Sequence, residues 1–234
     1  MSAEKIRIDY FNDLLCVWAY VSQIRVNELK QQFGAKVEVN YHFIPVFGCV
    51  NKRIGEGWKE KGSYSGFNQH VQSVCHDFSH LDICPDLWEK VVPSSSWTSH
   101  HLLKSIQLLE KKAIISPDAE AQWNQNSLFE EAMWRVRLAF FKEGRDISQV
   151  AELLSIVEQL PLPTDKILEQ MNNGEALAAL HRDIERRNEY HVEGSPTYVL
   201  NNGRQKLYGN VGYKIIEANV REVMETPENR ASWC

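Results

Sequence analysis

The chain has no apolar run that approaches the ~20 residues needed for a membrane-spanning helix. It also has no excess of basic residues, since 26 Lys and Arg stand against 31 Asp and Glu and leave a net charge of −5. A chain with net negative charge is not attracted to nucleic acid or to an anionic membrane surface, so we expect neither as a partner. Residues 1–5 lack the basic-then-apolar order of a secretion signal, so we expect a cytoplasmic protein.

Cysteine is too scarce to form a disulfide framework, because the chain has five thiols, an odd number, in 234 residues. A chain of this length buries a sufficient core without disulfides, and we expect reduced thiols. Cys75, His76, His80 and Cys84 lie close in sequence, but two of them are adjacent and no Cys-x-x-Cys pair accompanies them. That spacing is poor for a metal site, so we expect core thiols and surface histidines.

No internal repeat, low-complexity segment or flexible linker divides the chain. In its first part, residues 6–11 are typical of a short buried strand, and residues 17–33 have the period of a helix that ends before Gly34. Residues 37–44 are typical of a second strand that ends at Pro45. Strand, helix and strand at this spacing indicate a βαβ unit with parallel strands.

The middle of the chain has helical periodicity. In the helices predicted over 148–160 and 174–190, we expect Val150 and Leu177 to face the core, together with the apolar residues one turn further along. Helices are predicted over residues 97–111 (after a cap in Ser94–Ser96), from Asp118, and over 148–160, 164–171 and 174–190.

The last part of the chain has the pattern of a hairpin and a helix. Residues 197–200 and 205–208 are predicted strands joined at Asn202-Gly203, a strong hairpin signal, and a helix follows over 213–224. A βαβ unit, a block of helices and a ββα unit in that order are typical of a thioredoxin fold, so the predicted class is α/β. We expect residues 1–50 and 186–234 to form that fold and residues 60–185 to form an inserted all-helical subdomain.

Cys16 stands where the first strand turns into the first helix. A helix N-terminus carries partial positive charge and free N–H groups, so we expect this thiol to ionise easily and to be the catalytic nucleophile. Ala19 occupies the position of the second cysteine of a dithiol motif. The structural alternative for Cys16 is a small buried core residue.

Ser195-Pro196 leads into the third predicted strand. Proline has no N–H for a ladder bond, and a tight bend at this point favours a cis Ser195–Pro196 bond, with an ordinary trans turn as the alternative. In the cis form the carbonyl and N–H of Ser195 would face outward and pair with an extended thiol peptide, which would lie beside Cys16.

Three passages make the chain resemble the DsbA-like branch of the thioredoxin superfamily, which includes FrnE-type oxidoreductases, kappa-class glutathione transferases and 2-hydroxychromene-2-carboxylate isomerases. They are DYFNDLLCVWAY at 9–20, AFFKEGRDI at 139–147, and GSPTYVL at 194–200 with Tyr208-Gly209 beyond it. The resemblance implies that Cys16 is the attacking thiol, that Pro196 is the cis proline, and that Ser195 meets the backbone of a peptide or of glutathione.

The chain departs from both branches of this family. Val17 and Ala19 replace the proline and second cysteine of the usual Cys-Pro-x-Cys, whereas the transferases and isomerases usually have serine at the position of Cys16. A mixed disulfide at Cys16 therefore needs an external thiol such as glutathione, or another protein thiol such as Cys49, to resolve it. We expect glutathione as co-substrate and no tightly bound cofactor, and a homodimer is one oligomeric state open to the chain.

Four further residues are candidates for contacting glutathione or another substrate. Trp18 follows the thiol by two residues and is expected to border the site. Asn12 either orients a ligand or, with Asp13, caps the first helix. The backbone N–H groups of Asn210 and Val211, at the start of the last helix, are expected to bind a carboxylate such as that of glutathione.

Three functions fit this sequence. The first is a monothiol thiol-disulfide oxidoreductase coupled to glutathione. The second is a kappa-like glutathione transferase or isomerase that acts on an aromatic substrate, and the third is a binding protein that has the fold without turnover. An aromatic substrate cavity and packing in the helical core are alternative roles for five tryptophans, and we favour core packing for them: Trp58, Trp88, Trp97, Trp123 and Trp134.

Overall fold

The computed structural model describes residues 5–226 and residue 232. Its four strands form one mixed sheet in the order β2-β1-β3-β4. The strands are β1 (Ile6–Asn12), β2 (Val37–Phe43), β3 (Thr197–Leu200) and β4 (Gln205–Tyr208). β1 pairs parallel with β2 and antiparallel with β3, and β4 continues the antiparallel hairpin. This is the sheet of a thioredoxin fold, and the α/β class predicted from the sequence is confirmed.

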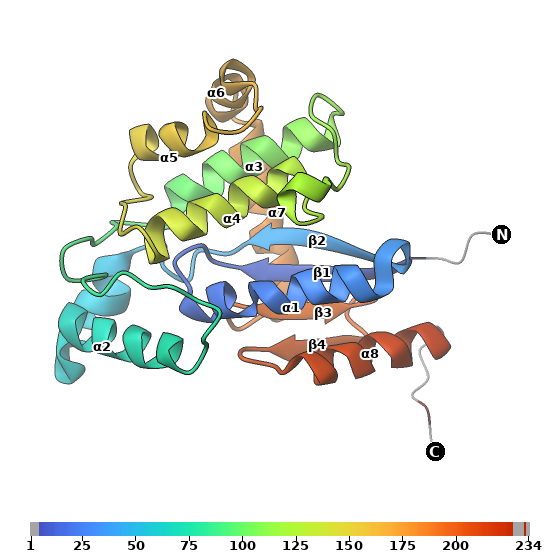
Figure 1. Cartoon of the computed structure of the whole chain (residues 1–234), viewed down its shortest axis with the longest axis horizontal. Coiled ribbons are helices and arrows are strands. Elements are labelled where there is room, and N and C mark those ends of the chain that lie inside the picture. Colours follow the sequence, from blue (N-terminus) through green and yellow to red (C-terminus); the bar gives the residue numbers. More distant parts are fainter. Residues whose placement is uncertain (1–4, 227–231, 233–234) are drawn as a thin grey trace.

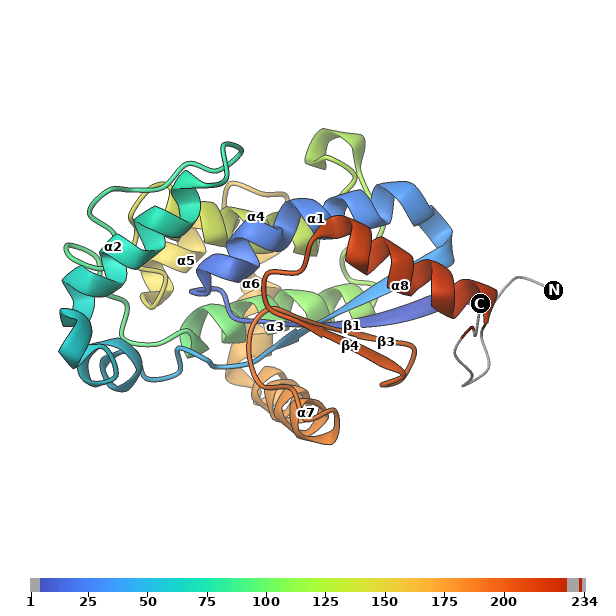
Figure 2. The same cartoon turned by 90° about the horizontal axis from the view of Figure 1, so that it is seen from below.

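Helices cover both faces of the sheet. Figure 2 shows α1 (Val17–Phe33) and α8 (Tyr213–Glu225) on one face and α7 (Glu175–Glu189) on the other. Successive side chains of a strand point to opposite faces. Ile8 and Tyr10 accordingly belong to the large hydrophobic core that includes α1, whereas Phe11 belongs to a small second cluster with Ile44, Val192 and Val199. A strand covered on both faces is usually almost continuously apolar, but β1 carries Arg7 and Asp9, and the buried Asp9 carboxylate is paired with Arg7.

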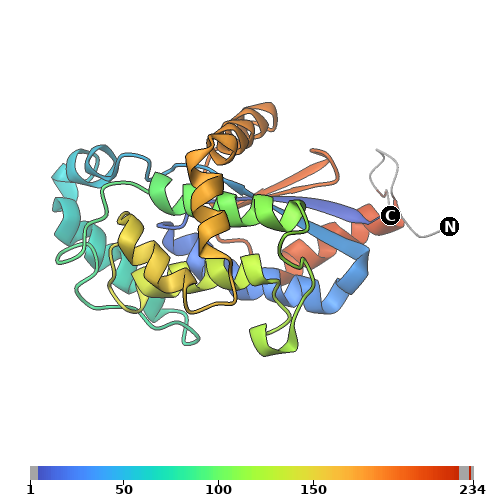
Figure 3. The same cartoon turned by 90° about the horizontal axis from the view of Figure 1, so that it is seen from above.

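The remaining helices lie beyond the β2 edge and beyond one end of the sheet (Figures 1 and 3). They are α2 (Ser63–His76), α3 (Trp97–Lys111), α4 (Leu128–Phe141), α5 (Val150–Val157) and α6 (Thr164–Asn172). α2 lies past the ends of β1 and β2, near the start of α1 (Figure 1). One continuous core joins the sheet to these helices, and the proposed boundaries of a helical insertion stay a prediction. In the part of the chain that is described, no helix is both long and apolar enough to cross a membrane.

The helix predicted from Asp118 begins ten residues later, so that prediction was wrong. Only a short 3-10 turn forms at Ala121–Trp123, and it ends where Asn124 and Gln125 take positive φ angles of 55° and 63°. α4 begins after Ser127, which forms a capping box with Glu130. The Ser127 hydroxyl accepts from the Glu130 N–H at 3.3 Å, and the Glu130 carboxylate accepts from the Ser127 N–H at 2.8 Å.

Replacing Ser127 by alanine should lower the free energy of unfolding by about 1 kcal/mol, because the N–H of Glu130 loses its acceptor. Urea unfolding followed by tryptophan fluorescence would measure this change. Asp118→Ala is the matched control at the helix start predicted from sequence, and it should stay within about 0.5 kcal/mol of the parent because Asp118 is exposed. An equal loss in both variants would contradict the capping role.

Two residues predicted to face the core are exposed, Val150 to 43% and Leu177 to 55%. Val150 is the first residue of α5, and the buried side of that short helix runs through Leu153, Ile156 and Val157. The buried residues of α7 are instead Ala176, Ala179, Leu180 and Asp183. A charged side chain therefore takes an inward position on α7, and apolar periodicity alone misplaces that face.

A candidate thiol site at the start of helix α1

Cys16 lies in the turn that joins β1 to α1. Its N–H donates to the Asp13 carbonyl at 3.2 Å, and its own carbonyl accepts from the N–H groups of Ala19 and Tyr20 at 3.1 Å each. Cys16 is the N-cap residue of α1, in an extended conformation, and only 5% of its surface is exposed. The thiol thus stands at the helix N-terminus, as the sequence predicts.

Ser195 and Pro196 lie against this turn. The bond between them is cis, as predicted. The Cys16 Sγ donates to the Ser195 carbonyl at 3.2 Å, and the Asp13 N–H donates to the Ser195 Oγ at 2.9 Å. The Pro196 carbonyl accepts a hydrogen bond from the N–H of Gly209, the residue that follows β4, at 2.9 Å. Two hydrogen bonds therefore fix the Ser195 segment to the thiol turn, although these segments are far apart in the sequence.

The acidity of Cys16 differs from the sequence prediction. Burial raises the pKa of the Cys16 thiol, and the negative charge of Asp13 adds to this effect. A hydrogen bond from the Ser195 side chain and hydrogen bonds from the backbone N–H groups of Ala19 and Trp18 act in the opposite direction but do not offset burial. The prediction of an easily ionised thiol was therefore wrong for the resting protein, in which Cys16 is a hydrogen-bond donor.

Asp13 contributes to this site in a way that the sequence analysis missed. Its side chain is fully buried. The Oδ1 atom accepts from the Leu15 N–H at 2.9 Å, and Oδ2 accepts from the Phe47 N–H and the Ser96 Oγ at 2.8 Å each. Ser96 precedes α3 but does not cap it with its side chain; Ser95 Oγ accepts from the Trp97 N–H instead. The signal in the sequence was an acidic residue at an apolar turn, three residues before the cysteine.

Asn12 has its polar atoms engaged inside the fold. Its Oδ1 accepts from Arg137 Nη2 at 2.7 Å, and its Nδ2 donates to the His42 carbonyl at 3.3 Å. The second nitrogen at the end of the Arg137 side chain donates to Gln23, and both Asn12 and Arg137 are fully buried. The structure therefore gives Asn12 a role in holding the end of β1, and it does not cap α1.

The other predicted ligand contacts are Trp18, Asn210 and Val211. Trp18 is half-buried in the first turn of α1, and its ring meets the Phe78 ring edge-on with centroids 6.5 Å apart. Asn210 is exposed after β4. The N–H of Val211 donates to the Gly209 carbonyl at 2.9 Å, and its binding of a carboxylate stays a prediction.

The other described cysteines are unpaired. Cys49 is exposed, Cys84 is half-buried, and burial raises the pKa of Cys75 to about 11. Within residues 5–226 and residue 232, no group of three or more His, Cys, Asp or Glu side chains has metal-binding geometry. Cys234 lies outside the described residues.

Two of the five tryptophans border a cavity. Trp123 and Trp134 line a space of about 620 Å³ between α1, α4 and α5, whereas Trp88 is fully buried in the core. The Trp134 ring ends a stack in which Tyr20 lies between it and Phe141, with centroid distances of 5.5 and 4.5 Å. Cys16 is not among the residues that line this cavity, so the cavity does not form part of the thiol site.

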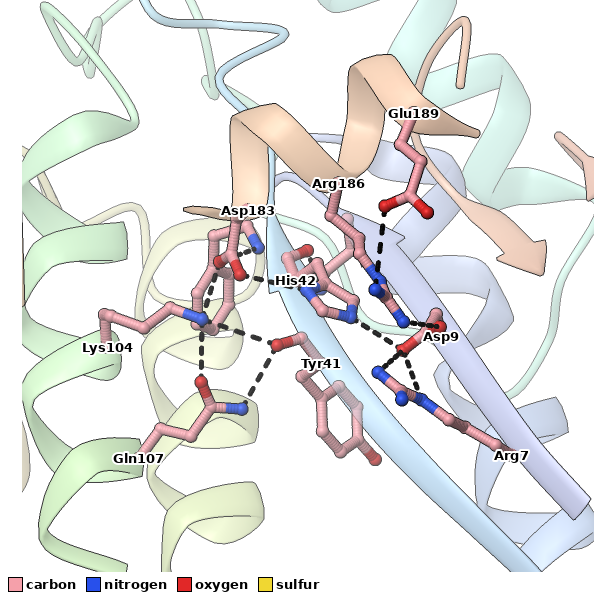
Figure 4. A network of polar contacts seen from close by, with 11 residues as sticks. Arg7, Asp9, Tyr41, His42, Lys104, Gln107, Asp183, Arg186 and Glu189 are labelled. Carbon is pink, nitrogen blue, oxygen red and sulfur yellow. Dashed lines mark hydrogen bonds and ion pairs between the residues drawn. The ribbon is translucent and has the colours of Figure 1, made fainter. Parts of the chain in front are cut away.

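A buried ionic network lies on the face of the sheet that α7 covers, opposite to the face covered by α1 (Figure 4). His42 of β2 links two carboxylates, with Nε2 2.8 Å from Asp9 Oδ1 and Nδ1 2.9 Å from Asp183 Oδ1. Lys104 of α3 lies 2.5 Å from Asp183 Oδ2, and Arg186 of α7 lies 3.5 Å from Asp9 Oδ2. The network joins the sheet to the helix that leads into the Ser195 segment.

Ion pairing determines the acidity of the groups in this network. Burial alone would raise the pKa of Asp183, but the hydrogen bond from His42 and the charge of Lys104 outweigh it and lower the pKa. The pKa of Asp9 is lowered in the same way, by His42, Arg7 and Arg186 against burial. Both carboxylates are therefore held in their charged form.

Comparisons with known proteins match this architecture. A family model of the DSBA-like thioredoxin domain matches residues 113–221. No curated protein matches the chain. Among solved structures, the chain is similar to the cytosolic disulfide reductase DsbM from Pseudomonas aeruginosa, at 18% identity and a TM-score of 0.60 over 92% of this chain and 98% of that one.

Two further solved structures have similar folds. One is a 2-hydroxychromene-2-carboxylate isomerase, at 16% identity and a TM-score of 0.63 over 97% of this chain and 100% of that one. The other is a probable DsbA oxidoreductase from Streptomyces coelicolor, at 15% identity and a TM-score of 0.69 over 98% and 93%. At these identities the likeness establishes the fold.

Proposed function

We propose that this chain, which has a DsbA-like thioredoxin domain, is a thiol-disulfide exchange enzyme that works with a single cysteine, Cys16, and with glutathione as the second thiol. The observation that carries this proposal is the hydrogen bond between Cys16 Sγ and the Ser195 carbonyl. Through this hydrogen bond the thiol, at the first turn of α1, lies against the Ser195 backbone. We propose that a disulfide substrate pairs with that backbone segment. Ala19 at the resolving position makes an external thiol necessary.

The exchange proceeds in two balanced steps. Cys16 loses its proton to solvent, and its thiolate attacks one sulfur of a disulfide substrate; a Cys16 mixed disulfide forms and one substrate thiolate leaves. A glutathione thiolate then attacks the mixed disulfide and restores the Cys16 thiolate, which regains a proton. The N–H groups of Trp18 and Ala19 stabilise the thiolate form of Cys16 in both steps.

The resting hydrogen bond gives the Ser195 carbonyl a second role. In a mixed disulfide the Cys16 sulfur has no proton to donate, so the Ser195 carbonyl loses that partner. It then accepts a backbone N–H of the attached glutathione or peptide, which holds the substrate in place for the second step. Substrate attachment and backbone pairing are thereby linked through one oxygen atom.

Glutathione is the small thiol that we favour, for two reasons. The missing second cysteine calls for an abundant external thiol, and a structure of the similar DsbM protein is described with GSH. Exposed Asn210 and half-buried Trp18 are proposed to border the bound tripeptide. A cytoplasmic location, where reduced glutathione is abundant, fits this chemistry.

A second candidate function has one observation in its favour. Burial raises the pKa of Cys16, and the thiol acts as a hydrogen-bond donor. Such a group could donate to the sulfur of bound glutathione, in a transferase or isomerase that acts on an aromatic substrate. In that case the glutathione sulfur reacts and Cys16 forms no covalent bond.

Incubation with oxidised glutathione, followed by mass spectrometry of the intact protein and its peptides, tests the proposal. We expect one glutathione on the peptide that contains Cys16, and its removal by added reduced glutathione. A Cys49→Ser variant is the matched control, because Cys49 is exposed and would react without any specific site. Folded protein that takes up glutathione only at Cys49 would contradict the proposal.

A further inference from the structure

The carboxylate of Asp13 connects three segments that surround Cys16. Its acceptor bonds reach the thiol turn at Leu15, the segment after β2 at Phe47, and the start of α3 at Ser96. The Asp13 N–H reaches a fourth segment through the Ser195 hydroxyl. Each of these bonds is 2.8 or 2.9 Å long, and the residue is fully buried. Asp13 is therefore placed to hold the thiol turn against its neighbours.

All three donors to this carboxylate are electrically neutral, namely two backbone N–H groups and a hydroxyl. His100 of α3 lies close, with Nε2 3.6 Å from Asp13 Oδ1. That nitrogen accepts from the Leu14 N–H at 3.2 Å, so it has no proton to give to the carboxylate in this arrangement. The described donors thus stabilise the buried negative charge without cancelling it.

This charge acts on Cys16 from within the same turn. Asp13 raises the pKa of the thiol, in addition to the larger effect of burial. The other ionisable side chain beside the thiol is Tyr10 of β1, which is buried and has its own pKa raised by burial. Arg137 of α4 faces Tyr10 and is held by Gln23 and Asn12. Among these groups, Asp13 is the anion that opposes a thiolate at position 16.

We propose that Asp13 is a positioning residue that keeps Cys16 as a thiol bonded to the Ser195 carbonyl, so that the resting site is unreactive until a substrate enters. The carboxylate acts in two ways. Its hydrogen bonds fix the turn that directs Sγ toward Ser195, and its charge disfavours a second negative charge on the sulfur. The inference rests on the proposed function only in taking Cys16 as the reacting group.

Alkylation by iodoacetamide, measured site by site in the full chain from pH 5 to 10, tests this inference. In Asp13→Asn the charge is lost and one acceptor oxygen remains. We expect Cys16 to be alkylated about threefold faster or more at pH 7, because a larger fraction is thiolate, with the midpoint of its pH profile moved to lower pH. Exposed Cys49 in the same sample is the internal standard and should not change.

Ser96→Ala is the matched control, since it removes one donor to the carboxylate and leaves the charge in place. The alkylation rate of its Cys16 should stay within about twofold of the parent, although loss of a buried hydrogen bond lowers the stability of the fold. Equal acceleration in both variants would mean that loosening of the turn, and not loss of the charge, exposes the thiol, and it would overturn the electrostatic role of Asp13. No acceleration in Asp13→Asn would overturn it as well.

A second measurement does not depend on the folding of Asp13→Asn. In the parent protein, the carboxylate ¹³C resonance of Asp13 should shift as Cys16 titrates, because the two charges interact. An Asp13 resonance that is constant through the Cys16 titration would overturn the inference. Neither measurement uses glutathione, so a parent protein that fails to react with glutathione would count against the proposed function and leave this inference standing.

Discussion

Replacing Cys16 by alanine should reduce exchange with glutathione disulfide by at least about 10³-fold, because removal of the nucleophile leaves only binding and orientation to act. Cys75 is buried with a raised pKa, and exposed Cys49 lies outside the site, so its unspecific reaction is the background from which the loss is measured. The rate of glutathione release, coupled to a glutathione reductase assay, would measure the loss. An exchange rate that survives in Cys16→Ala would contradict the proposed function.

Cys16→Ser separates the two candidate functions. A serine hydroxyl keeps a donor for the Ser195 carbonyl, but it does not form a nucleophilic anion at neutral pH. We therefore expect this variant to lose exchange as completely as Cys16→Ala. If Cys16 only donates a hydrogen bond to bound glutathione, serine should keep much of the activity with an aromatic substrate while alanine loses it. Cys49→Ser should be close to the parent in both assays, as the matched thiol substitution outside the site.

Replacing Asp183 by asparagine should lower the free energy of unfolding by about 3–5 kcal/mol, because it removes one partner of a buried ion pair. Lys104 is 3% exposed, and its Nζ lies 2.5 Å from Asp183. Burial already lowers the pKa of Lys104 against the opposing charge of Asp183, so the ammonium group depends on that carboxylate. Urea unfolding at pH 7 would measure the loss.

Glu189→Ala is the matched control on the same helix. Its side chain is 59% exposed at the rim of the network, 3.6 Å from Arg186, and an exposed pair of this kind contributes about 0–1 kcal/mol. The double variant Lys104→Met with Asp183→Asn should lose less stability than the sum of its two single variants, because neither charge is left alone. A loss in Asp183→Asn no larger than in Glu189→Ala would contradict the network's role.

The pH dependence of the same comparison has a definite sign. The folded pKa of Asp183 is lowered, so its stabilisation is present above the ordinary carboxyl pKa and is lost as the pH falls through the folded value. The difference in stability between the parent and Asp183→Asn should therefore shrink in acid below about pH 4. A difference that is unchanged at pH 3 would indicate a loss of packing and not of charge.

Local sequence patterns were sufficient for most of the fold. The strands over 197–200 and 205–208 and the helices over 17–33 and 97–111 have the predicted ends. Apolar periodicity, the Asn202-Gly203 turn and the glycine after the first helix are short-range signals, and each acts within a few residues of the structure that it specifies. The start of α4 was predicted wrongly at Asp118, although the structure shows a local signal of the same kind at the true start, the Ser127–Glu130 capping box.

The sequence by itself determined that a single thiol stands at a strand-to-helix turn, that Ala19 gives it no second cysteine in its motif, and that Ser195-Pro196 leads into a strand. Only the tertiary structure decided the state of that thiol. Burial by segments remote in sequence raises the pKa of Cys16, the nearby Asp13 charge adds to this effect, and the thiol donates to the distant Ser195 carbonyl. Electrostatic energies depend on distance in space and on exclusion of water, which no local pattern of residues encodes.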